Sequence, residues 1–280
     1  MYFVYFSCGA HAAYLELSLR SLARVRGSFV GRVYIGEDPD DPLSSEDKTR
    51  LGAIGLPLSY GSWGKVTGYG ETTILSELQA FRDVAAGMNA NDWIVKVDSD
   101  VLFLNNSAFG YAQHQVADLV GNKELAWGAF PYSQGGCYFL RAGWVCQSGA
   151  MEFGEVRAMA KDVLHRFHLI AENKNKWRMP QCPEDAFMHQ FVGDRGGRIR
   201  LSNYYLPLWQ VDRLMHDGLR LRLRKLGVLK ALVAPRLAAG IAWHDYMLCR
   251  NRYSVIHFMS CKERMPAVFD ILTAARSVGR

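Results

Sequence analysis

The sequence predicts an α/β fold in which helices flank a central, mostly parallel sheet. Segments of strand length alternate with segments of helical pattern up to Asp98, as in nucleotide-binding sheets. The last of these strands lies within Trp93–Leu104, which reads W-I-V-K-V-D-S-D-V-L-F-L and holds two aspartates in an apolar run. Because open α/β sheets bind ligands beyond the carboxyl ends of their strands, this stretch predicts a site as well as a fold.

Apolar periodicity places the elements along the chain. The first half alternates strands with helices and has one glycine-rich loop: strand 2–7, helix 11–25, strand 33–36, a helix starting at 44–47, strand 56–60, loop 61–70, helix 72–86 and the strand from 93. The second half is less regular: strand 125–130, turn 131–135, strand 136–140, helix 152–167, helix 183–191, extended segment 199–208 and strand 253–258.

Composition excludes several classes of protein. A hydrophobic content of 49% supports a sizeable core, and the six cysteines form no C-x-x-C pair, which argues against a zinc site or a disulfide framework. The opening M-Y-F-V-Y-F-S-C lacks the basic start of a signal peptide, and no uncharged apolar run reaches the roughly 18 residues of a membrane span. We therefore expect a soluble, unexported, cytoplasmic protein.

The net charge of +6 is concentrated in Arg213–Arg236, which contains seven Lys and Arg residues and only one acidic residue, Asp217. Apolar residues form a broad helical stripe beside them: Leu219, Leu223, Leu226, Leu229 and Val233. This pattern predicts peripheral contact with the anionic inner face of the plasma membrane, with a solvated or partly buried helix as the alternative. We expect no nucleic-acid partner, because no aromatic residue interleaves the arginines and no reader motif is present.

Asp98 and Asp100 need a cation or water, since an unpaired buried carboxylate is costly. Residues i and i+2 of a regular strand point to the same face, so both carboxylates can face one divalent ion. If the strand ends between them, the two carboxylates have different roles at the site. The alternative is a solvated turn after the strand.

Four further features point to chemistry, and each also has an ordinary structural explanation. Gly135–Gly136 before a strand lets backbone approach a ligand, or forms a turn. Glu184–Asp185 at a helix start supplies a general base and an acceptor anchor, or compensates the helix dipole. His257 is a metal ligand or a core histidine, and Lys262 holds a phosphate or is solvated.

The order of these features resembles the GT-A fold of nucleotide-sugar-dependent glycosyltransferases, over roughly residues 2–264. V-D-S-D-V-L-F-L is similar to a strand of the glycogenin and lipooligosaccharide galactosyltransferase family, glycosyltransferase family 8. His257–Lys262 is similar to that family's H-x-x-G-x-x-K-P-W, with Ser260 in place of the glycine and the lysine one residue early. Pro183–Asp185 stands where that family has D-Q-D, and is closer to the x-E-D of many inverting enzymes.

The resemblance implies a domain organisation and a set of site residues. It implies one catalytic domain at 1–264, with a nucleotide-binding half at 1–104 and an acceptor half at 105–264 that includes the basic segment 213–236, followed by a tail at 265–280. It implies that Mn²⁺ or Mg²⁺ is bound by Asp98, Asp100 and His257. The donor-binding residues that it implies are Ser7, Gly9, His11 or Tyr14, Arg82, Asp98, Gly135, Gly136 and Lys262.

The resemblance also implies a catalytic role for Asp185, with Glu184 beside it. In an inverting enzyme Asp185 takes the proton of the acceptor hydroxyl, and in a retaining enzyme it positions the donor sugar or supports its transition state. We therefore expect a metal-dependent transferase that moves a hexose from a nucleotide sugar, with a UDP-sugar favoured, to a glycan or glycolipid hydroxyl. Surface polysaccharide or lipooligosaccharide assembly is the expected pathway.

Two other functions compete with this one. A phosphatase or phosphotransferase of the haloacid-dehalogenase type would use Asp98 as nucleophile, but Leu102 stands where that pattern requires threonine or valine, and three predicted strands precede this one. A non-catalytic module would bind the sugar nucleotide without turnover. A sugar-phosphate nucleotidyltransferase is disfavoured, because Ser7–His11 replaces its glycine-rich start.

Overall fold

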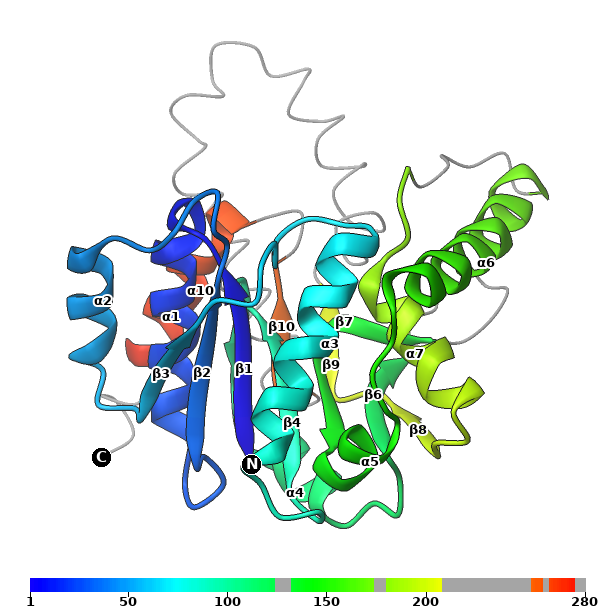
Figure 1. Ribbon diagram of the computed structural model, residues 1–280. Helices are drawn as coiled ribbons and strands as arrows, with labels where there is room; N and C mark the ends of the chain where they lie inside the picture. The colour runs from blue at the N-terminus through cyan, green and yellow to red at the C-terminus, as the bar shows by residue number, and fades with distance from the viewer. Residues whose placement is uncertain (124–131, 174–179, 208–252, 259–261, 275–280) are drawn as a thin grey trace, which may run out of the picture.

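The computed structural model describes residues 1–123, 132–173, 180–207, 253–258 and 262–274. Its centre is a seven-stranded sheet with the strand order β3-β2-β1-β4-β7-β6-β8 (Figure 1). These strands are β1 (Tyr2–Ser7), β2 (Arg32–Glu37), β3 (Leu58–Gly61), β4 (Trp93–Asp98), β6 (Leu119–Lys123), β7 (Ser133–Arg141) and β8 (Ile199–Ser202).

The sheet is mostly parallel, as the sequence predicts. β1 pairs in parallel with β2 and β4, β2 with β3, and β6 with β8, whereas β7 runs antiparallel to both of its neighbours. Phe6 pairs with Asp98, so the carboxyl ends of β1 and β4 meet at one edge of the sheet. The D-x-D stretch therefore lies at the middle of the edge where such sheets bind ligands.

Alternating residues of β1 and β4 point to opposite faces, and helices cover both faces (Figure 1). Val4 and Ile94 pack on one face with four helices: α3 (Glu71–Ala86), α5 (Ala142–Gln147), α6 (Phe153–Asn173) and α7 (Glu184–Asp194). Phe3 and Val95 pack on the other face with α1 (Ala12–Val25) and α4 (Ser107–Gln113). Burial of these apolar side chains on both faces is the main stabilising contribution to the fold.

A second, three-stranded sheet has the order β5-β10-β9. Its strands are β5 (Val101–Phe103), β9 (Tyr205–Pro207) and β10 (Val255–His257), and β10 runs antiparallel to β5. Helix α10 (Met265–Ala274) buries Met265, Val268 and Leu272 against Ile256 and Phe258 of this region. Residues 265–274 of the predicted C-terminal tail thus form a helix that packs on this second sheet.

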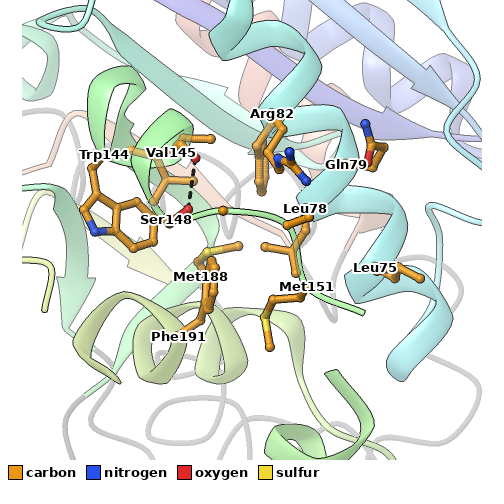
Figure 2. A pocket seen from close by; sticks show the side chains of 14 residues that line it. Leu75, Leu78, Gln79, Arg82, Trp144, Val145, Ser148, Met151, Met188 and Phe191 are labelled. Carbon is orange, nitrogen blue, oxygen red and sulfur yellow. Dashed lines mark hydrogen bonds between the residues drawn. The ribbon is translucent and has the colours of Figure 1, made fainter. Parts of the chain in front are cut away.

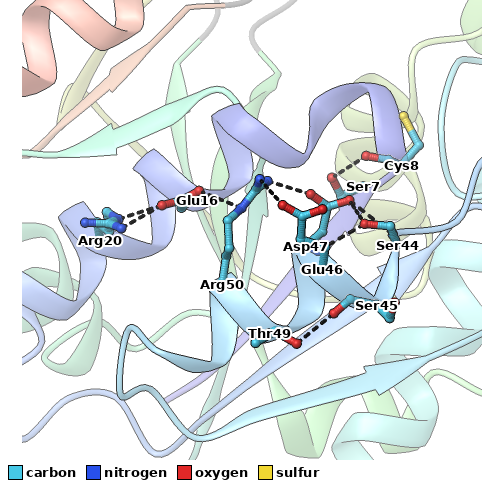
Figure 3. A network of polar contacts seen from close by, with 10 residues as sticks. All are labelled: Ser7, Cys8, Glu16, Arg20, Ser44, Ser45, Glu46, Asp47, Thr49 and Arg50. Carbon is cyan, nitrogen blue, oxygen red and sulfur yellow. Dashed lines mark hydrogen bonds and ion pairs between the residues drawn. The ribbon is translucent and has the colours of Figure 1, made fainter.

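Helix α2 (Ser45–Gly52) begins where the sequence places a helix start. Ser44 caps it, since the Asp47 N–H donates to Ser44 Oγ at 3.0 Å and the Ser44 N–H donates to Asp47 Oδ2 at 3.1 Å. Arg50 then bridges Asp47 at 2.6 Å and Glu16 of α1 at 3.5 Å, as Figure 3 shows. These contacts tie α2 to the helix that follows the β1 loop, with a modest contribution from exposed ion pairs.

Helices α4 and α5 and strand β6 were not predicted, and one predicted strand starts at a different residue. β7 starts at Ser133, so Gly135 and Gly136 lie inside a strand and not before it. Glycine has no side chain to show the period-2 pattern of a strand, which hides the start of β7. The predicted strand 125–130 and the basic segment 213–236 lie outside the described residues. Within the described part of the chain, no helix combines the length and the apolarity that a membrane crossing requires.

Candidate active site

The two aspartates stand where the chain passes from one sheet to the other. β4 ends at Asp98, and β5 begins at Val101 and pairs with β10, where His257 lies opposite Val101. The Phe258 N–H donates to the carbonyl of Asp100 at 2.9 Å, which fixes the turn between the strands. The strand therefore ends between the aspartates, one of the two arrangements that the sequence allows.

Asp98, Asp100 and His257 form a cluster of three side chains whose ligand atoms all lie within 4.8 Å of one another. His257 Nε2 lies 3.2 Å from Asp100 Oδ1 and 3.5 Å from Asp98 Oδ2. Asp100 and His257 are buried, while the Asp98 side chain is 33% exposed. Two carboxylates and an imidazole can together hold a divalent cation, so the residues present fit a metal of that charge.

Within the cluster, Asp100 and His257 hold their charges by mutual pairing. Burial opposes charge on both partners, but His257 and Lys262 outweigh it and bring the pKa of Asp100 far below its usual range. In the same way Asp100 and Asp98 outweigh burial and raise the pKa of His257. A bound divalent cation would take the place of the imidazolium proton as the partner of these carboxylates.

The β1 loop and Lys262, at the start of the short 3₁₀ helix Lys262–Arg264, reach this cluster. Lys262 Nζ lies 3.4 Å from Asp100 Oδ2 and 3.3 Å from His11 Nε2. His11 ends the short 3₁₀ turn Gly9–His11 that follows β1, and burial, with Lys262, lowers its pKa. Two segments that are 251 residues apart in sequence thus meet beside Asp100.

The rest of the β1 loop is closed by the acidic turn after β2. Gly9 donates its N–H to the carbonyl of Asp41 at 2.7 Å, and the Ala10 N–H donates to Asp41 Oδ2 at 2.8 Å. A Cβ on Gly9 would lie 2.6 Å from Asp41 Oδ1, so the close approach requires glycine. Ser7 is buried at the end of β1, one residue beyond the pair Phe6–Asp98.

A buried lysine joins the D-x-D to the acids of α7. Lys96 Nζ lies 2.6 Å from Asp98 Oδ1 and 2.7 Å from Glu184 Oε1, and it donates to the carbonyl of Gly135 at 2.9 Å. Burial opposes its charge, but Asp98, Glu184 and Glu77 raise the pKa of Lys96 well above its ordinary value. Lys96 in turn outweighs burial and lowers the pKa of Glu184, so the pair is ionised.

Asp185 is held against the same glycine from the other side. The Gly135 N–H donates to Asp185 Oδ2 at 2.9 Å, so the backbone of Gly135 contacts Lys96 through its carbonyl and Asp185 through its N–H. Pro183 precedes α7 in an extended conformation and places both acids in the first turn. A Cβ on Gly135 would lie 2.7 Å from Glu184 Oε1, which shows how closely strand and helix approach.

We expect Gly136→Ala to displace His257. A Cβ at Gly136 would lie 2.5 Å from Nδ1 and 2.6 Å from Cγ of the buried His257 ring, so the ring or the strand must shift. Overpacking of this kind costs about 1–3 kcal/mol, so the melting temperature should fall by several degrees in thermal unfolding. Gly154→Ala is the matched control, because a Cβ at Gly154 meets nothing within 4 Å. If Gly136→Ala is as costly in a His257→Ala background, the clash is not with the imidazole.

Glu77 of α3 is buried and interacts electrostatically with Lys96, and its Oε2 has no hydrogen-bond partner among the described residues. Burial is the largest influence and raises the pKa of Glu77 well above its ordinary value; Lys96 opposes this and Glu184 adds to it. The folded state therefore binds a proton at Glu77 that the unfolded chain releases above its ordinary carboxyl pKa. Stability due to this group is lost as pH rises from that value through the folded pKa.

Glu77→Gln is expected to remove this loss. The melting temperature of the variant relative to the unsubstituted protein should rise steadily from about pH 5 to about pH 8, because only the original side chain must release its proton. The measurement is thermal unfolding across that pH range, with Glu46→Gln, whose side chain is 84% exposed, as the control. A difference that stays constant with pH would contradict the proton assignment.

The structure does not bring Arg82 to this cluster. Arg82 lies on α3 and lines a small, mainly apolar cavity of about 40 Å³ with Trp144, Met151, Met188 and Phe191 (Figure 2). No contact of Arg82 with Asp98, Asp100 or His257 is found in the part of the chain that the structure describes. Tyr14, the alternative to His11, has its ring centroid 6.5 Å from that of His11.

Sequence reasoning assigned no role to Lys96 or Glu77. A signal for Lys96 was present, since a charge inside an apolar strand two residues before Asp98 must share its face. Its second partner, Glu184, lies 88 residues later, and nothing in the sequence joins the two. Glu77 is one acid on an amphipathic helix, and only the packing of α3 on the sheet shows that it is buried.

Comparison with known proteins gives matches in structure alone. No family model matches the chain, and no curated protein matches its sequence. A structure of the galactosyltransferase LgtC in complex with donor and acceptor sugar analogues is similar over 98% of this chain and 96% of that chain, at 14% identity and a TM-score of 0.54.

Two further structures are similar at comparable identity. An active-site mutant of LgtC matches over 77% of this chain and 78% of that chain, with 12% identity and a TM-score of 0.51. Mouse xyloside xylosyltransferase 1 in its apo form matches over 91% and 96%, with 11% identity and a TM-score of 0.49. At these identities the two LgtC structures establish a shared fold.

Proposed function

We propose, from the premise that this chain has the GT-A fold of the LgtC structures, that it is a divalent-cation-dependent glycosyltransferase. The observation that carries the proposal is the cluster of Asp98, Asp100 and His257 at the carboxyl end of β4, with Lys262 beside it. The donor is a nucleotide sugar, with a UDP-sugar favoured. The transferred group is a hexose, and the acceptor is a hydroxyl of a glycan or glycolipid.

The donor side of the site derives from the cluster and the β1 loop. Asp98, Asp100 and His257 would hold Mn²⁺ or Mg²⁺, which when bound neutralises the charge that develops on a departing diphosphate. Lys262 adds a positive charge beside Asp100, and Asp98 is exposed enough to reach the ribose. The turn after β1, with Ser7, Gly9 and His11, receives the nucleoside.

The acceptor side derives from α7 and β7. Asp185, held by the Gly135 N–H, takes the proton of the acceptor hydroxyl in an inverting reaction or positions the donor sugar in a retaining one. Glu184 forms an ion pair with Lys96 and stays ionised, so its proposed role is to hold the neighbouring side chains in position. Gly135 and Gly136 have no side chains, which lets Glu184, Asp185 and His257 lie directly against β7 beside the proposed donor and acceptor positions.

We place the reaction in the assembly of a bacterial-type surface polysaccharide or lipooligosaccharide, at the inner face of the plasma membrane. The support for this setting is the basic, amphipathic pattern of 213–236, which suits an anionic surface and a lipid-linked acceptor. Binding to vesicles with and without anionic lipid, compared with a variant whose arginines in this segment are replaced by glutamine, tests it.

The function is tested by thermal unfolding with UDP, GDP, CMP and ADP, each with and without Mn²⁺. A nucleotide at a hundredfold excess over its dissociation constant stabilises by about 2.7 kcal/mol, or several degrees in a chain of this length. We expect one nucleotide to stabilise only with the metal, and its sugar conjugate to be turned over in the presence of an acceptor. Binding without turnover would indicate a binding module, and stabilisation by Mg²⁺ with beryllofluoride alone would indicate a phosphotransferase.

A further inference from the structure

Lys96 is a buried cation whose surroundings are built from three separate elements. Its side chain is 3% exposed, and its Nζ contacts Asp98 of its own strand, Glu184 of α7 and the carbonyl of Gly135 in β7. An ammonium has three N–H donors, so these three oxygens use all of them. The Tyr138 ring, with its centroid 5.7 Å from Nζ, covers another side of the charge.

The same carboxylate serves this lysine and the cation cluster. Asp98 Oδ1 lies 2.6 Å from Lys96 Nζ, whereas Asp98 Oδ2 faces His257 Nε2 at 3.5 Å. Any cation held by Asp98, Asp100 and His257 therefore shares the charge of Asp98 with an ammonium that is already in place. Two like charges on one carboxylate repel, and in a buried site the repulsion is only weakly screened.

Glu184 is tied to Asp98 through the same ammonium. Lys96 Nζ is 2.7 Å from Glu184 Oε1, and both acids lie within hydrogen-bonding distance of this one atom. The next residue, Asp185, holds the N–H of Gly135, whose carbonyl Lys96 also contacts. A change in how strongly Asp98 holds the lysine is thus transmitted to the acids at the start of α7.

We propose that Lys96 is a positioning residue that couples the cation cluster to the acids of α7 and weakens cation binding by competing for Asp98. The inference takes from the proposed function only that Asp98 is a cation ligand. If Lys96 only supported the fold, it would strengthen cation binding by keeping the ligands in place. If it competes for Asp98, it weakens cation binding and makes the cation easier to exchange. The two roles predict changes of opposite sign.

The experiment is a titration of the nucleotide-free protein with Mn²⁺, following the free ion by electron paramagnetic resonance. We expect Lys96→Met to bind Mn²⁺ about tenfold more tightly than the unsubstituted protein, because a nearby positive charge is removed. Lys96→Arg should stay within about threefold of the original affinity, because the charge is kept. Lys161→Met, an exposed lysine of α6, removes the same charge far from the site and should change nothing.

Loss of the ammonium removes the lysine partner of Asp98 and of the buried Glu184, so Lys96→Met can fail to fold. The double variant Lys96→Met with Glu184→Gln also removes the repulsion between the carboxylates of Asp98 and Glu184, so the test can still be made. This double variant should bind Mn²⁺ more tightly than Glu184→Gln alone. Coupling predicts that Glu184→Gln weakens Mn²⁺ binding more in the original background than in the Lys96→Met background.

The outcomes separate the two proposals. Equal or weaker Mn²⁺ binding by the folded lysine variants overturns the role of Lys96 and leaves the proposed function standing. If the folded, unsubstituted protein binds neither Mn²⁺ nor Mg²⁺, the cation cluster itself is disproved, and both proposals are overturned together.

Discussion

Asp100→Asn is expected to abolish metal-dependent nucleotide binding and to reduce kcat/KM for sugar transfer by about a thousandfold, which corresponds to about 4 kcal/mol. Asp100 is buried and pairs with both His257 and Lys262, which outweigh burial and hold its pKa far below its usual range, so it presents a full negative charge to a cation. The amide keeps the shape and removes the charge. The measurement is calorimetric titration with nucleotide and Mn²⁺, together with steady-state kinetics.

Asp162→Asn is the control for Asp100→Asn, since Asp162 is an exposed aspartate of α6 that pairs with Arg166 at 2.7 Å. It should leave binding and turnover unchanged. Nucleotide binding by Asp100→Asn that keeps its full dependence on Mn²⁺ would show that the metal is held elsewhere, and the D-x-D would then lose its proposed role.

Asp185→Asn is expected to reduce kcat by about a thousandfold while leaving the dissociation constant of the nucleotide unchanged, as removal of a general base does. Asparagine can still accept the Gly135 N–H through its carbonyl oxygen, so the loop geometry is kept and only the charge is lost. Single-turnover kinetics, with separate measurement of nucleotide affinity, check this.

Asp194→Asn, at the other end of the same helix, is the matched control for Asp185→Asn. Its side chain accepts from Gln190 at 3.1 Å and lies away from the acids of the first turn. A kcat for Asp185→Asn within about tenfold of the original would exclude Asp185 as the base. The anomeric configuration of the product, read by NMR, then decides whether the site is of the inverting or the retaining kind.

Much of the fold follows from local pattern. The alternation of Trp93, Val95 and Val97 with Ile94 and Lys96 predicts a strand buried on both faces, and the structure has this strand at the centre of the sheet. The resemblance to the GT-A fold, read from a few short motifs, is confirmed at the level of fold by the LgtC structures. Boundaries were less predictable where glycine hides the period, as at the start of β7.

The residues of the candidate site could be predicted where they belong to a sequence motif. They could not be predicted where a residue's role depends only on which neighbours it contacts in the fold. Asp98, Asp100, His257 and Lys262 were expected to meet, and the structure brings them together. Arg82 was expected at the donor, but it lines a cavity between α3, α5 and α7. Helical periodicity shows which face a residue is on, but not which neighbour that face meets.

By itself, the sequence determined the alternation of strands and helices up to Asp98, the mostly parallel sheet, and the position of two aspartates at the end of a central strand, because these depend on periodicities of two and 3.6 residues. Only the tertiary structure decided that β4 ends at Asp98, that His11 approaches Lys262, and that one buried ammonium joins Asp98 to Glu184. Those contacts join residues that are far apart in the chain, and their energies depend on distance and burial, which no local pattern contains.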